Sequence, residues 1–284
     1  MKSIVIIPNV KKDEGMAVTG RLVSLLSSHN AELYIDQKYY SESVCDVNYY
    51  SKFPLNADLI VVVGGDGSML DASMLAVEHD IPMLGVNLGK VGYLSEIEPS
   101  DIEALSGLFS GEYTVKEEML LSVECLGPDK HIRSERLAVN EVAISHDSFF
   151  GISKFSLCNK SGECVKYRAD GLLFATRLGS TAYSLSAGGP ILGPDVRAIL
   201  ATPVCSHSFF NRSIIFSESE ILTVENTAES RLNVTVDGRF FCRIEPGERV
   251  SVCRADKMLK ILTLNPNNTF ATLFGKIKIM EDVK

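Results

Sequence analysis

The sequence contains no tryptophan, no block of basic residues and no apolar run close to the ~20 residues that span a bilayer. Its formal net charge is −8, which disfavours nucleic acid as the main target, and no membrane partner is expected. An anionic ligand would therefore have to be bound by local donors, such as backbone N–H groups or a few placed Arg and Lys residues.

Export signals and metal-binding cysteine patterns are also missing. The N-terminal stretch MKSIVIIPNVKKDEG continues with charge where a signal peptide has a small-residue cleavage site, so we expect a first strand there and a cytoplasmic location. The seven cysteines include no C-x-x-C motif, and we expect reduced thiols. Cys158 and Cys164 have no suitably spaced partners for zinc, so no metal ligands are assigned.

The first 115 or so residues alternate between two kinds of pattern. Short continuous apolar runs, such as 2–8 and 57–65, predict buried strands, and segments with helical spacing, such as 15–29 and 68–80, lie between them. This alternation predicts a parallel, Rossmann-like α/β domain over residues 1–115. Ligands bind such sheets at the carboxyl ends of the strands.

The pattern changes after this point. Short alternating segments with turns about every 8–12 residues predict an antiparallel β-sandwich domain over residues 116–261, interrupted by a helical patch near 180–202. For the tail, residues 262–284, we consider packing against the first domain.

The stretch LIVVVGGDGSML (59–70) ends a buried strand with three glycines around one carboxylate, Asp66. Gly64, Gly65 and Gly67 permit positive φ and close approach, so the N–H groups of the turn can face a phosphate. Because a carboxylate repels a phosphate, Asp66 acts either through Mg²⁺ or as a general base for the attacking group. The alternative is an ordinary β-turn, in which Asp-Gly is common. The Walker pattern and G-x-G-x-x-G are both absent.

Asn140 and Glu141 lie side by side in the otherwise apolar stretch AVNEVAIS (138–145). A buried Asn needs hydrogen-bond partners, and an unpaired buried carboxylate costs several kcal/mol. The pair therefore indicates a strand end at a cleft. The alternative is an edge strand with one wet face.

The segment 167–191 has more small polar residues than a plain core helix. A helix start with capping oxygens is expected at 179–181, Tyr183 can stack on a flat ring, and Asp170 adds an acceptor. We interpret the segment as a ligand site. The nearest cations for phosphates are Lys166, Arg168 and Arg177.

Asp237 and Gly238, in VTVDGRFF (234–241), are typical of a hairpin turn between alternating strands. Arg239, just beyond the turn, is a further cation within reach of an anionic ligand.

Taken in this order, these segments resemble the NAD kinase family over most of the chain. GGDGSML followed by IPMLGVNLGKVGYLSE resembles that family's strand–turn–helix and the strand after it, and AVNEVAIS resembles its Asn-Glu motif. GGDG alone is shared with phosphofructokinases and with diacylglycerol and sphingosine kinases. The long run GSTAYSLSAGGP is therefore the discriminating feature.

The resemblance implies ATP- and Mg²⁺-dependent phosphorylation of the adenosine 2′-hydroxyl of NAD, giving NADP, with polyphosphate as a donor in some members. It also implies an α/β domain joined to a β-sandwich domain, and a homodimer or homotetramer. By position, Asp66 would be the general base beside Gly64, Gly65 and Gly67. The residues that would hold NAD are Asn140, Glu141, Arg168, Asp170, Thr181, Ala182, Tyr183, Ser184, Leu185 and Ser186.

The sequence departs from the commonest family pattern without losing a motif residue. The departures are Ser68 for Thr, Ala169 for Gly, Arg177-Leu178 for Thr-Pro and Arg239 for Gln. The added cations bear on phosphate affinity or on the choice between NAD and NADH. Two other functions stay open, namely a GGDG kinase acting on a lipid or sugar phosphate and a non-catalytic NAD(P)-binding regulator.

Overall fold

The computed structural model divides the chain into two compact units. It describes residues 1–89, 92, 94–95, 97–127, 129, 131–147, 152–207 and 211–264. Unit 1 comprises Met1–Glu117 with the described residues from Leu259 onward, and unit 2 is Glu118–Met258. The sequence boundaries at 115 and 261 remain predictions about where separate folding domains begin and end. Residues 265–284, and with them most of the tail considered above, lie outside the described residues.

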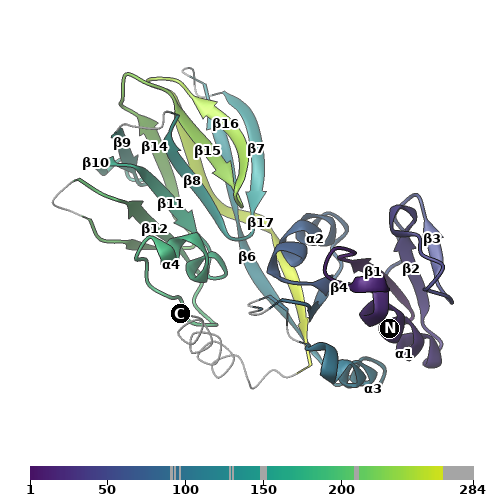
Figure 1. The fold of residues 1–284 in the computed structure, drawn as a ribbon. Helices are drawn as coiled ribbons and strands as arrows, with labels where there is room; N and C mark the ends of the chain where they lie inside the picture. Colours follow the sequence, from purple (N-terminus) through teal and green to yellow (C-terminus); the bar gives the residue numbers. More distant parts are fainter. Residues whose placement is uncertain are drawn as a thin grey trace. The chain divides into compact units, whose positions relative to one another are not determined.

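Unit 1 is built on a parallel sheet with the strand order β3-β2-β1-β4-β5. Figure 1 labels β1, β2, β3 and β4 of this sheet. The strands are β1 Ser3–Pro8, β2 Glu32–Asp36, β3 Asn48–Tyr50, β4 Leu59–Gly64 and β5 Met83–Asn87. Every residue of β4 and β5 is buried, as continuous apolar runs predict for strands covered on both faces. This confirms the predicted α/β class.

Helices connect the strands of this sheet. They are η1 Glu14–Met16, α1 Ala17–Ser28, η2 Gln37–Tyr39, α2 Asp66–His79, η3 Pro99–Ser106 and α3 Gly107–Ser110. Leu22, Val23 and Leu26 of α1 are buried, which is the apolar stripe that the helical spacing predicts. None of the helices in the described ranges is long and apolar enough to cross a bilayer.

Unit 2 consists of two sheets of mainly antiparallel strands, in agreement with the predicted sandwich. One sheet has the order β13-β12-β11-β8-β15-β16, and the other contains β10-β9-β14-β17 with β6 and β7. The strands are β6 Thr114–Leu126, β7 Ile132–Ala138, β8 Glu141–His146, β9 Ser153–Cys158, β10 Cys164–Ala169, β11 Gly171–Ala175, β12 Ala198–Val204, β13 Ile214–Ser217, β14 Ile221–Asn226, β15 Leu232–Val236, β16 Arg239–Ile244 and β17 Arg249–Thr263. Inward-facing residues of both sheets form one core, for example Phe155 and Tyr167 with Phe174 and Val234.

The helical patch predicted near 180–202 is wrong in its extent. Only η4 Gly179–Thr181 and α4 Tyr183–Ser186 are helical, and 198–204 is strand β12. Ala182 interrupts the helical backbone with φ −98° and ψ −125°, and Gly188 and Gly189 follow closely. Tertiary pairing of β12 with β11 and β13 overrides the local helical spacing.

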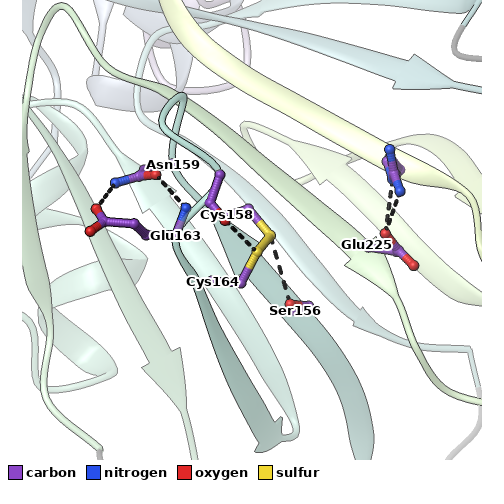
Figure 2. Close-up of a disulfide and its surroundings, with 8 residues drawn as sticks. Ser156, Cys158, Asn159, Glu163, Cys164 and Glu225 are labelled. Carbon is purple, nitrogen blue, oxygen red and sulfur yellow. Dashed lines mark hydrogen bonds and ion pairs between the residues drawn. A yellow bond between two sulfur atoms is a disulfide. The ribbon is translucent and has the colours of Figure 1, made fainter.

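The expectation of reduced cysteines is wrong for four of the seven. Cys158 pairs with Cys164, and Cys125 pairs with Cys242, while Cys45, Cys205 and Cys253 are free thiols. Figure 2 shows the first pair at the β9–β10 hairpin, where antiparallel register places the two Cα atoms 4.1 Å apart. The turn between them is closed by hydrogen bonds between Asn159 and Glu163, including Glu163 N–H to Asn159 Oδ1 at 2.9 Å.

Candidate active site

The glycine-rich turn of unit 1 joins β4 directly to α2. Gly64 is the last residue of β4, Gly65 is the N-cap of α2, and Asp66 is the first helical residue. None of these glycines, nor Gly67, has positive φ, so the turn does not require the left-handed conformations considered above. A Cβ at Gly64 would lie 2.6 Å from the Cβ of Ser68, whereas one at Gly67 would meet nothing within 4 Å. Gly64 therefore serves close packing, and Gly67 leaves open space.

Asp66 is half-buried in the first turn of α2, where the helix dipole favours a negative charge. Its Oδ1 accepts a hydrogen bond of 2.9 Å from the backbone N–H of Leu94, which follows β5. The carboxylate is thereby held in one orientation next to the N-terminal N–H groups of α2. The turn thus presents N–H donors that an anion can accept, with a hydrogen-bond acceptor beside them.

The loop after β1 lies against the same turn, and the sequence analysis missed it. Asn9 donates its backbone N–H to the carbonyl of Val63 at 2.8 Å and its Nδ2 to Ser68 Oγ at 2.8 Å. Lys12, on the same loop, places Nζ 3.1 Å from the position that a Cβ at Gly65 would occupy. The two consecutive lysines just after the first strand were the available signal.

In unit 2, Asn140 and Glu141 lie where β7 gives way to β8, so the predicted strand end is confirmed. The edge-strand alternative is wrong, because β8 pairs with both β11 and β15. Glu141 is 7% exposed, and its Oε2 is buried with no hydrogen-bond partner within the described part of the chain. The side chain of Asn140 likewise makes no hydrogen bond to another described residue and is partly exposed. Such a pair can accept and donate hydrogen bonds to a ligand.

Asp237 organises this pair, a role that sequence reasoning missed. The predicted hairpin turn is confirmed, with positive φ at Asp237 (49°) and Gly238 (72°) between β15 and β16. The Asp237 carboxylate accepts the backbone N–H groups of Val139, Asn140 and Glu141 at 2.9, 2.7 and 3.1 Å. One side chain thus fixes three consecutive peptide groups at the entrance of β8.

Burial perturbs both carboxyls of this cluster. Desolvation, followed by the charge of Asp237, raises the pKa of Glu141 from 4.5 to about 7. Desolvation also raises the pKa of Asp237, and the three N–H donors oppose that rise. Carboxyls with perturbed pKa values cluster at functional sites, so this pair is a candidate for one.

The segment predicted to bind a ligand is fixed against Asn140. Thr176 donates its backbone N–H to the Asn140 carbonyl at 2.9 Å, and the Gly179 N–H bonds to Thr176 Oγ1 at 3.1 Å. A Cβ at Gly179 would overlap the Asn140 carbonyl oxygen and lie 2.5 Å from its carbon. Glycine is therefore required here by close backbone approach.

The hydroxyl groups of this segment fall into two kinds. Ser180 Oγ, Thr181 Oγ1 and Ser184 Oγ bond within the protein, to the carbonyls of Arg177 and Leu178 and to Thr202 Oγ1, respectively. The side chains of Tyr183 and Ser186 are exposed and have no hydrogen-bond partner among the described residues. These two are therefore the side chains of the segment most available to a ligand.

In the folded chain, Arg168 and Asp170 lie away from Asn140 and Glu141. β11 pairs Gly171 with Ser145 and Ala175 with Glu141, so the start of β11 is at the opposite end of β8. At ~3.3 Å per residue, this places Asp170 more than about 13 Å from Glu141 along the strand.

Comparison with known proteins identifies the family. A model of the ATP-NAD kinase N-terminal domain matches residues 4–113, and a model of the C-terminal domain matches residues 139–264. The NAD kinase of Thermoanaerobacter pseudethanolicus is 32% identical, over 98% of this chain and 99% of the relative. The chain belongs to the ATP-NAD kinase family. The NAD kinase of Lachnoclostridium phytofermentans is 34% identical, over 97% of this chain and 99% of the relative.

Solved structures of ATP-NAD kinase relatives share the fold. Yeast NADH kinase complexed with NADH superposes with a TM-score of 0.79 at 22% identity, covering 97% of this chain and 88% of that one. The NAD kinase from Archaeoglobus fulgidus in complex with ATP has a TM-score of 0.72 at 24% identity, covering 98% and 99%. At these identities the comparison shows the fold alone.

The departure from the ATP-NAD kinase pattern at Arg177 has a structural explanation. Its guanidinium forms a bidentate ion pair with Glu118, with Nε 3.0 Å from Oε2 and Nη2 bonded to Oε1. The side chains are only 20% and 11% exposed, respectively. Arg177 is therefore neutralised inside unit 2 and links the start of the segment predicted to bind a ligand to Glu118 of β6.

Proposed function

We propose that this chain is an NAD kinase that transfers the terminal phosphoryl group of MgATP to the adenosine 2′-hydroxyl of NAD. The observation that carries the proposal is the placement of Asp66, an oriented and half-buried carboxylate at a glycine-rich strand-to-helix turn. Membership of the ATP-NAD kinase family supports the substrates. The long polar segment at 179–186 favours a dinucleotide over a lipid acceptor.

Asp66 acts in the proposal as the general base. A ribose hydroxyl has a high pKa, so a carboxylate within hydrogen-bond reach assists its attack by typically ~10²–10⁴-fold. The hydroxyl oxygen bonds to the γ-phosphorus, the bond between that phosphorus and its bridging oxygen breaks, and the proton passes to Asp66. The products are NADP and ADP.

The metal enters as part of the donor in this proposal. No group of three His, Cys, Asp or Glu side chains in the described ranges has the geometry to hold a cation. Mg²⁺ characteristically binds through substrate phosphates, several waters and one or two carboxylates. We therefore assign it to MgATP, where it neutralises phosphate charge. Polyphosphate is a second donor to be tested.

Asn140 and Glu141 are proposed to bind the ribose or the nicotinamide side of NAD. Both offer side-chain groups without hydrogen-bond partners among the described residues, on a backbone fixed by Asp237. The remaining acceptor contacts are assigned to the segment 181–186, with Thr181 and Ser184 holding its shape and Ala182, Tyr183, Leu185 and Ser186 facing the ligand. Arg168 and Asp170 are assigned to NAD from the family resemblance alone, because within the chain they lie at the other end of β8 from Glu141.

A coupled assay of NADP formation from ATP and NAD tests the proposal. Wild-type protein should produce NADP, and Asp66→Asn should retain NAD binding while turnover falls by at least ~100-fold. Asparagine keeps the oxygen that accepts the Leu94 N–H, so a folded variant is expected. Full activity of Asp66→Asn would reject the role of the carboxylate.

The two open alternatives are tested by offering other acceptors with ATP and by measuring binding of NAD and NADP. Phosphorylation of sphingosine, diacylglycerol or fructose 6-phosphate in place of NAD would identify another GGDG kinase. Binding of NAD or NADP without turnover would identify a regulator. We further propose a homodimer or homotetramer in the cytoplasm, and a monomer in sedimentation at working concentration would contradict the assembly.

A further inference from the structure

The parallel sheet of unit 1 reverses its strand order between β1 and β4 (Figure 1). From β1 the chain passes through α1 to β2 on one side, and from β4 it passes through α2 to β5 on the other. The carboxyl ends of the two strands flank the place where open α/β sheets bind their ligands. Two loops begin there, the loop of Asn9 and Lys12 and the glycine-rich turn.

Lys12 reaches across this switch point to the turn. Its Nζ lies 3.1 Å from the ideal Cβ position of Gly65. Gly65 has φ −101° and ψ −170°, an extended conformation open to any residue, so its backbone does not require glycine. A side chain at position 65 would instead compete with the ammonium group for this space.

The loop that carries Lys12 has a fixed base. Lys12 and Asp13 both donate their backbone N–H groups to the Asn9 carbonyl at 2.9 Å, and Asn9 is bonded to Val63 and Ser68. On the other side, the buried Asp13 carboxylate accepts the N–H groups of Val18 and Thr19 at 2.9 Å. The backbone on both sides of Lys12 is therefore held by hydrogen bonds.

In the described part of unit 1, three cations are paired with carboxylates, whereas Lys12 is not. Arg21 pairs with Glu103, Lys38 with Asp36 and Lys260 with Asp80. Lys12 is exposed, and no side chain in the described ranges forms an ion pair or hydrogen bond with its ammonium group. The cation is thus available to a ligand next to the helix that begins with Asp66.

We propose that Lys12 binds the terminal phosphates of the donor in the transfer reaction. This assignment depends on the proposed function. Asp66 brings a negative charge to a position that must also accept a triphosphate, and Lys12 offsets that repulsion from the facing loop. In P-loop NTPases, a loop lysine contacts the β- and γ-phosphates of the nucleotide on a different fold.

The test compares Lys12→Met, Lys12→Arg and the matched control Lys11→Met in the full chain. Lys11 is the exposed neighbour, and its own loop contact is a backbone N–H to Asn9 Oδ1 at 3.2 Å. Initial rates of NADP formation are measured with ATP varied at saturating NAD, and with NAD varied at saturating ATP. Thermal unfolding is recorded for each variant.

Lys12→Met should lower kcat/KM for ATP by about 10- to 100-fold, which is the usual effect of losing one hydrogen bond to a charged group. KM for NAD and the unfolding temperature should stay at wild-type values, because the Lys12 side chain makes no hydrogen bond or ion pair with another described residue and its backbone bond to Asn9 is kept. Lys12→Arg should restore part of the loss, and Lys11→Met should match wild type.

Wild-type kcat/KM for ATP in Lys12→Met would overturn the assignment while leaving the kinase function intact. A rise in KM for NAD equal to that for ATP, or a lowered unfolding temperature, would show a structural role and overturn it as well. Absence of NADP formation by the wild-type protein would instead overturn the proposed function.

Discussion

Replacing Gly179 by alanine tests how closely the ligand segment must approach Asn140. The added Cβ would overlap the Asn140 carbonyl oxygen and lie 2.5 Å from its carbon and 2.8 Å from its Cα. All three atoms belong to backbone that Asp237 and Thr176 already hold by hydrogen bonds. The segment itself must therefore move.

The expected loss has two parts. Overpacking costs about 1–3 kcal/mol, and displacement of Gly179 also breaks its N–H bond to Thr176 Oγ1, worth about 1 kcal/mol. We expect the free energy of unfolding to fall by about 2–4 kcal/mol. KM for NAD should rise, because the displaced segment carries Tyr183 and Ser186.

Gly20→Ala is the matched control for this substitution. Gly20 lies inside α1, its φ is not positive, and an added Cβ would meet nothing within 4 Å. Alanine there should raise stability by about 0.5–1 kcal/mol through helix propensity. Urea denaturation and NADP formation are measured for both variants. A Gly179→Ala protein as stable and active as wild type would refute the close approach.

Two further predictions concern the carboxyl pair of unit 2. Asp237→Asn places an amide donor against one of the three N–H groups that the carboxylate accepts, so the free energy of unfolding should fall by about 1–3 kcal/mol in urea titrations; an unchanged midpoint would contradict the organising role. The pKa of Glu141 is about 7 in the folded protein and 4.5 in its ordinary, unfolded state, so between these pH values the native state keeps a proton that the unfolded chain loses. The stability of the wild-type protein should therefore fall as pH rises from 4.5 to 7. Glu141→Gln removes this loss, and its stability relative to wild type should increase between pH 4.5 and 8 by up to about 3 kcal/mol; a constant difference over that range would rule out the raised pKa.

Patterns of residues close together in the sequence correctly predicted several strands, one helix and one turn. Continuous apolar runs marked β4 and β5, helical spacing marked α1, and Asp-Gly marked the β15–β16 turn. The helical patch near 180–202 failed because the spacing of small residues is ambiguous. Pairing of β12 between two neighbouring strands decided that segment.

Part of the candidate site could be predicted from the sequence, because polar residues occur where the surrounding pattern predicts glycine or apolar residues. A carboxylate among glycines at Asp66, and a polar pair in an apolar run at Asn140 and Glu141, conflict with a purely structural role. The sequence could not separate the hydroxyls of 179–186 into ligand-facing and internal groups. That distinction depends on which of them find acceptors after folding.

The sequence by itself determined the two kinds of sheet, the family and the motif residues, because each is encoded by neighbours along the chain. Only the tertiary structure decided that Asp237 holds the backbone of Asn140, 97 residues away, and that Cys125 pairs with Cys242, 117 residues away. It also decided that Lys12 faces Gly65. These contacts depend on strand order and register, which long-range packing selects and which periodicity along one segment does not contain.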